Sequence, residues 1–131
     1  MKAKTLTIFI ERNAGDVYDF VQNPENMPKW AKTFCKSIKR TGEDWVLMTP
    51  QGPARLKITE RNDLGVLDHY LTPAPGVDLL VPMRVVPNGR GSEVIFTLFQ
   101  LPMIPDENFA KDIIKVRTDL RTLKGVMESD R

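Results

Sequence analysis

The single histidine and one arginine lie in otherwise apolar stretches, where ionisable side chains are uncommon. His69 alternates with two leucines in segment 65–72, so it faces the apolar side of a predicted strand. Its imidazole could donate or accept a proton near neutral pH. Arg84 lies in the apolar segment 79–87, and its guanidinium could orient a carboxylate, an enolate or a phenolate. His69 and Arg84 are therefore the candidate catalytic residues.

Structural roles are the favoured alternatives for both residues, which leaves enzymatic activity open. A histidine in a core or pocket wall needs only one hydrogen bond, and Arg84 could pair with Asp68 or Asp78. Gln100 extends the apolar face of the preceding strand. It could be a polar anchor at the end of a cavity, or it could end the strand in water.

Other catalytic and metal chemistry lacks the residues that it needs. Cys35 has no third group to orient a thiolate with His69, and one cysteine and one histidine cannot complete a structural zinc site. Paired carboxylates and glycine-rich phosphate loops are missing from the sequence, so we expect no metal and no cofactor. The net charge of +2 is too small to indicate a nucleic-acid partner. The basic run 29–40 is interpreted as a solvated strand edge, with a surface for nucleic acid or anionic lipid as the alternative.

The size and composition predict a single globular domain covering residues 1–131. Of the 131 residues, 41% are hydrophobic and 27% are charged, which is ordinary for a folded domain. The longest uncharged run, residues 94–105, is too short to span a bilayer. The N-terminal segment alternates like a strand and does not resemble a signal peptide. We therefore expect a cytoplasmic protein that does not insert into membranes.

The first 30 residues predict a strand followed by two short helices. Apolar and polar residues alternate from Leu6 to Ile10, and the period changes at Asn13, which can cap a helix. That helix must stop near Pro24, because proline disfavours helical geometry in the residue before it. Met27 and Trp30, three residues apart, indicate a second short helix.

From residue 34 to residue 101 the pattern predicts one strand after another. Turn-rich pieces separate the apolar segments, and Asn88-Gly89 is the strongest hairpin signal, with a predicted type I′ turn. Short connections favour an antiparallel meander. The predicted strands are 34–40, 44–49, 54–60, 65–72, 79–87 and 92–101.

The last segment predicts a long amphipathic helix over residues 105–128. Its apolar residues recur at spacings of four and three, and charged residues fill most other positions. The stripe could cover a face of the sheet or form a dimeric coiled coil, so both a monomer and a homodimer remain possible. Its members are Phe109, Ile113, Val116, Leu120, Leu123 and Met127.

This order of elements resembles the START-related helix-grip superfamily, which includes polyketide cyclase/dehydrase-like and lipid-transport proteins. The stretch NAGDVYDFVQNPENMPKWAKTF (13–34) is similar to the corner of two short helices in that superfamily. The stretches GVLDHY (65–70), PMRVVPNGRGSEVIFTLFQ (82–100) and DLRTLKGVMES (119–129) resemble its small bacterial members. The resemblance implies an α+β fold in which a curved antiparallel sheet of six or seven strands wraps around the long C-terminal helix.

The resemblance also implies a cavity between sheet and helix, so our first hypothesis is a binding protein for a small hydrophobic or aromatic metabolite or lipid. A cyclase or dehydratase acting through His69 and Arg84 is the second hypothesis. A protein-interaction module using the basic run or the C-terminal helix is the third. The expected ligand-binding residues are Trp30, Phe34, Trp45, His69, Arg84, Phe96, Gln100, Phe109 and Ile113.

Overall fold

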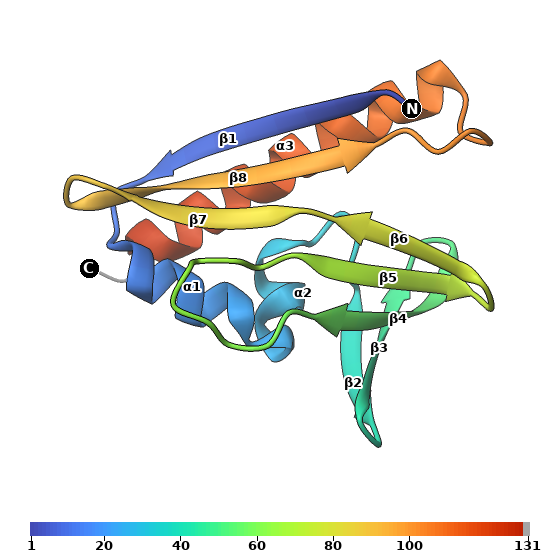
Figure 1. The fold of residues 1–131 in the computed structure, drawn as a ribbon, viewed down its shortest axis with the longest axis horizontal. Coiled ribbons are helices and arrows are strands. Elements are labelled where there is room, and N and C mark those ends of the chain that lie inside the picture. Colours follow the sequence, from blue (N-terminus) through green and yellow to red (C-terminus); the bar gives the residue numbers. More distant parts are fainter. Residues whose placement is uncertain (130–131) are drawn as a thin grey trace.

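The computed structural model describes residues 1–129 and has the predicted α+β helix-grip arrangement (Figure 1). Strands dominate the middle of the chain, and the long helix ends it. In chain order the elements are β1 (Ala3–Ile10), α1 (Ala14–Gln22), η1 (Pro24–Asn26), α2 (Met27–Trp30), β2 (Ser37–Thr41), β3 (Asp44–Thr49), β4 (Gly52–Ile58), β5 (His69–Ala74), β6 (Val77–Val81), β7 (Met83–Asn88), β8 (Gly91–Phe99) and α3 (Asp106–Ser129).

The strands form two antiparallel sheets rather than the single curved sheet that the resemblance implied. One has the order β1-β8-β7, and the other has the order β2-β3-β4-β5-β6. The predicted strand 79–87 is divided at Pro82, which has no N–H to continue a ladder. Leu67 N donates to Met83 O at 2.8 Å, so the segment before β5 links the two sheets.

A glycine allows this link to form. Gly65 has a φ of +71°, and a Cβ built there would lie 2.1 Å from Val85 O. Val85 N donates in return to Gly65 O at 3.0 Å. A side chain at position 65 would therefore push the two backbones apart.

The turn between β7 and β8 differs from the predicted type I′ turn. Asn88 pairs with Gly91 as the last rung of the ladder, which leaves Gly89 and Arg90 at the centre of the turn. Gly89 has a φ of +60°, whereas no non-glycine residue of the described chain has a positive φ. A positive φ at the first central residue alone is the pattern of a type II′ turn.

The two short helices begin and end where the sequence signals place them. Asn13 caps α1, since its Oδ1 accepts from Asp16 N at 2.9 Å. Asn23 ends α1 and accepts from Glu25 N at 3.1 Å, which starts η1. Met27 and Trp30 of α2 are both buried. The proline corner therefore turns two apolar residues into the core.

Helix α3 lies behind β1 and β8 in the view of Figure 1. Its backbone approaches β1 and α2 closely. The C-terminal half of its apolar stripe is fully buried through Leu120, Leu123 and Met127. These side chains join residues of α1, β1, β7 and β8 in one core, and each such burial stabilises the fold by about 1.5–3 kcal/mol.

Candidate functional site

The inner face of the five-stranded sheet, the one turned toward the core, is a continuous apolar surface. The pairing registers place Trp45 beside Leu56, Leu56 beside Leu71, and Leu71 beside Leu79. Directly paired residues point to the same face of a sheet, so these four side chains form one row across β3 to β6. We call this set the inner row.

The middle of the inner row is buried, and its two ends are partly exposed. Leu56 and Leu71 are buried, whereas Trp45 and Leu79 stay partly exposed. Ile113 and Val116, in the N-terminal half of α3, are partly exposed as well, although they belong to the same apolar cluster. The ends of the inner row and this half of the helix thus both carry half-buried apolar side chains.

His69 lies on the same inner face, one register step away from the inner row. It pairs with Ile58 on one side and Val81 on the other, and only 5% of its surface is exposed. Its Nδ1 lies 3.1 Å from Leu67 O, and its ring meets Phe96 edge-on at 6.5 Å between centroids. This position agrees with the prediction that His69 faces the apolar side of its strand.

Burial sets the protonation of His69. Desolvation lowers the pKa of the imidazole, and it outweighs the opposing effects of the Leu67 carbonyl and the Asp68 carboxylate. In the neutral ring, Nδ1 carries the proton that it donates to Leu67 O. Nε2 is then a hydrogen-bond acceptor, and no described residue bonds to it.

Arg84 lies on the opposite, outer face and does not meet His69. Met83 and Val85 point into the core, so alternation turns Arg84 outward. Its Nη2 donates to Asp68 Oδ2 at 3.1 Å, which is the structural pairing that the sequence had offered as an alternative. Asp68 also accepts from Met83 N, and the Arg84 contacts help to lower its pKa against burial.

Trp30 is part of the core, and its indole N–H has no partner. Only 3% of its surface is exposed, and Nε1 is a fully buried donor without an acceptor among the described residues. Trp30 and Phe34 flank the turn that leads from α2 toward β2, and both belong to the apolar cluster. An unpaired buried donor costs about 1–3 kcal/mol, so a ligand that accepted from Nε1 would remove this cost.

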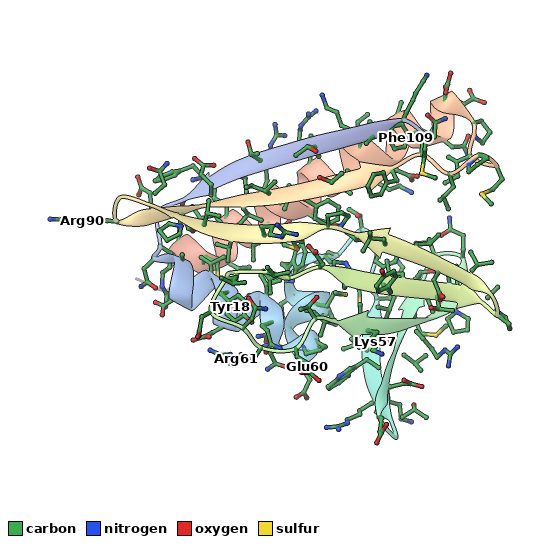
Figure 2. All side chains as sticks on the ribbon, in the orientation of Figure 1. Tyr18, Lys57, Glu60, Arg61, Arg90 and Phe109 are labelled. Atoms are coloured by element: carbon green, nitrogen blue, oxygen red, sulfur yellow. The ribbon has the colours of Figure 1, made fainter. Side chains whose placement is uncertain are left out.

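Four other predicted residues lie in different surroundings. Trp45 is on the inner row, under the Arg40 guanidinium at 5.9 Å. Phe96 contacts His69. Gln100 holds the loop before α3, donating to Ile104 O and Asp106 Oδ1 at 2.8 Å each, and so anchors backbone. Phe109 is buried at the start of α3 but lies outside the main core cluster (Figure 2).

Asp119 is a buried acid that the sequence reasoning missed. It accepts from Thr33 N at 3.0 Å and from Thr33 Oγ1 at 2.6 Å, which ties α3 to the segment after α2. Burial raises the pKa of this carboxyl, while the two Thr33 hydrogen bonds act in the opposite direction. Its position three residues after Val116, on the inner side of the helix, was the available signal.

Cys35 does not add a nucleophile. It is buried, its Sγ contacts Ser37 O, and desolvation raises the pKa of the thiol to about 11. The thiolate needed for attack is therefore scarce at neutral pH. Within residues 1–129, no group of histidine, cysteine and acidic side chains could hold a metal ion.

Two of the hollows on the surface of residues 1–129 lie away from the contact between the five-stranded sheet and α3. One, of about 270 Å³, is on the outer face of β3, β4 and β5, where Arg55 and Pro73 are part of its wall. The other, of about 190 Å³, runs between β1 and α3. None of the described helices is long and apolar enough to cross a membrane.

The sheet, the corner of short helices and the grip on α3, with an apolar inner face, together define a START-related helix-grip protein. The chain belongs to the family described as polyketide cyclase/dehydrase and lipid transport, whose sequence model matches residues 1–128. No curated protein is similar enough in sequence to be matched.

Solved structures show the same fold at low sequence identity. The protein XoxI from Bacillus cereus is 19% identical with a TM-score of 0.77, over 97% of this chain and 96% of its own. A START superfamily protein from Mycobacterium smegmatis is 16% identical with a TM-score of 0.75, over 98% and 99%. A protein solved as the Aha1 dimer, from Colwellia psychrerythraea, is 16% identical with a TM-score of 0.76, over 98% and 97%.

Proposed function

We propose that the protein binds a small, mainly apolar molecule between the inner face of the five-stranded sheet and the N-terminal half of α3. The observation that carries this proposal is the partial exposure of apolar side chains on both the sheet and the helix. Trp45 and Leu79 from the sheet, and Ile113 and Val116 from the helix, leave apolar surface open that a ligand could cover. Covering such surface stabilises a complex by about 25 cal/mol per Å².

Two polar atoms on the protein interior would orient the ligand. His69 Nε2 can accept a hydrogen bond, and Trp30 Nε1 can donate one. Few polar groups among many apolar ones is the usual composition of a site for a small molecule. The ligand class is therefore a hydrophobic or aromatic metabolite or lipid that carries at least one hydroxyl, carbonyl or amine group, bound in the cytoplasm.

A cyclase or dehydratase that uses His69 and Arg84 together does not fit this geometry. Arg84 is on the outer face with Asp68, so its guanidinium cannot stabilise an anion held beside His69. His69 remains available as a hydrogen-bonding group of the site. The family description includes enzymes, so catalysis of a reaction on such a ligand is the alternative to binding alone.

Two adjacent leucines of β6 provide a matched test. Leu79 is on the inner row, whereas Leu80 pairs with Tyr70 on the outer face and is 39% exposed. The protein, purified gently from its own cells, would be measured by native and denaturing mass spectrometry as wild type, Leu79→Lys and Leu80→Lys. We expect an extra mass that is lost on denaturation, present in wild type and Leu80→Lys and absent in Leu79→Lys.

Binding of added probes tests the site when the purified protein carries no ligand. The fluorescent anion anilinonaphthalene sulfonate and the fatty acid palmitate would be titrated into all three proteins. Weaker binding in Leu79→Lys, with Leu80→Lys unchanged, supports the inner site. Equal loss in both variants, or binding by neither probe to the wild type, would overturn it.

A further inference from the structure

We propose that the free edge of β1, together with two arginines of α3, is a docking site for an extended acidic segment of a partner protein. The segment would add to the three-stranded sheet as a new strand. This surface lies outside the ligand site described above. The two proposals can therefore be tested independently of each other.

Strand β1 is an edge strand, with β8 as its one neighbour in the sheet. Gln100 N donates to Lys2 O, and Thr97 N donates to Pro82 O on the other side of β8. In an antiparallel ladder these two bonds imply that the even-numbered residues of β1 bond to β8, and that the odd-numbered ones point away. The N–H and C=O groups of Thr5 and Thr7 therefore face outward.

The far end of this edge is already occupied by α3. Lys124 Nζ donates to Phe9 O at 2.8 Å, as expected for an odd-numbered carbonyl that points to the edge. No described residue bonds in this way to the backbone of Thr5 or Thr7. Exposed N–H and C=O groups of this kind are a template for pairing with another chain.

The hollow beside this stretch carries unpaired positive charge. Its lining combines three buried or half-buried apolar residues, Leu6, Ile8 and Leu120, with three exposed polar ones, Thr7, Arg117 and Arg121. Both arginines are exposed, and neither forms an ion pair with any of residues 1–129. Lys4 adds a further exposed positive charge on β1.

The spacing of the two arginines matches a strand. Residues four apart on a helix are about 6 Å apart along its axis. Alternate residues of a strand are about 6.8 Å apart. Because α3 runs alongside β1 in Figure 1, acidic residues at every second position of an added strand could each reach one arginine.

Charge decides between the two occupants that a free edge can take. A second copy of this chain paired at the same edge would add its own Lys4, Arg117 and Arg121 to the same basic surface, and like charges brought together oppose association. An acidic strand neutralises them instead.

The test uses a short fluorescent peptide of alternating valine and glutamate, capped at both ends, measured by fluorescence anisotropy. Two matched probes accompany it: the same peptide with its central amides N-methylated, and one with lysine in place of glutamate. We expect binding of the first peptide alone. Equal binding of the N-methylated peptide would overturn strand addition, because that peptide keeps its charge but cannot donate to β1.

Protein variants locate the site. Arg117→Glu with Arg121→Glu should weaken peptide binding by at least about tenfold. Thr7→Pro should weaken it too, since proline removes an edge N–H that the ladder does not use. The control, Lys39→Glu with Lys57→Glu, reverses two exposed charges on the five-stranded sheet, where Figure 2 labels Lys57 on β4. This control should bind like the wild type, and circular dichroism would establish that all variants fold.

Three further results would overturn the proposal. Loss of binding in the control would move the docking surface to the basic face of the five-stranded sheet. Tighter binding of a short oligothymidylate than of the peptide would indicate a nucleic-acid surface. A dimer in sedimentation that dissociates with Thr7→Pro would show that a second copy covers the edge.

Discussion

The two halves of α3 carry the same apolar spacing and have different surroundings. In the C-terminal half, Leu120 and Leu123 are 2% and 0% exposed. In the N-terminal half, Ile113 and Val116 remain partly exposed on the inner side, and Ile114 is 62% exposed on the other. Spacing therefore determines which way a side chain points, whereas the element opposite determines how tightly it packs. One half builds the core, and the other borders the proposed site.

Truncation in the two halves should show the largest difference. Leu123→Ala should lower the free energy of unfolding by about 3 kcal/mol, because it leaves a cavity in a sealed core. Ile113→Ala should lower it by only about 1 kcal/mol, since part of that side chain already faces water. Urea denaturation of both variants measures this. Equal losses would mean that the N-terminal half is as tightly packed as the C-terminal half.

A pH titration sharpens the description of the inner face. Burial holds the pKa of His69 below its ordinary 6.5. Above that value both the folded and the unfolded chain carry neutral histidine. As the pH falls below 6.5, the unfolded chain binds a proton that the folded chain resists, so stability falls until the pH reaches the folded pKa.

His69→Gln removes this dependence and serves as the reference. Between pH about 7.5 and about 5, thermal or urea unfolding of the wild type should lose stability relative to the variant. The raised pKa of Asp119 acts in the opposite direction at lower pH and is common to both proteins, so it cancels in the difference. Parallel profiles would mean that His69 is protonated as easily inside the fold as outside it.

The smallest effect is expected on the outer face. Arg84→Gln breaks a partly exposed ion pair with Asp68 and should lower stability by less than about 1 kcal/mol. Ligand binding should not change, because Arg84 does not lie on the inner face of the sheet. A large loss of ligand binding in this variant, with stability unchanged, would place the site on the outer face and contradict the proposed site on the inner face.

Local signals in the sequence predicted most elements. The start and end of a helix and its buried side depend on neighbours a few residues away. They can therefore be deduced from sequence spacing, as for Asn13, Pro24 and the apolar stripe on the last helix. The division of the strand 79–87 was missed, although Pro82 was its cause. Pro82 removes one backbone N–H donor. Whether the sheet needs that donor depends on which strand lies beside it, and the spacing of residues in the sequence does not identify that strand.

The candidate site was predictable in part. Alternation placed His69 on an apolar face, and the structure has it there. The hypothesis that His69 and Arg84 act together was wrong, because it required both side chains on one face of the sheet. Asp119 was missed, since its partner Thr33 is 86 residues away in the chain.

Residue order alone predicted the order of the elements and the direction in which each apolar side chain points. Both follow from periods of about 3.6 and 2 residues, which are local properties of the backbone. The helix-grip architecture was inferred from the resemblance to a known superfamily. The pairing of Asp68 with Arg84, the partial exposure of the N-terminal half of α3 and the open edge beside Arg117 and Arg121 required the folded chain. Each depends on which distant segments come into contact, and that contact follows from the packing of the whole domain.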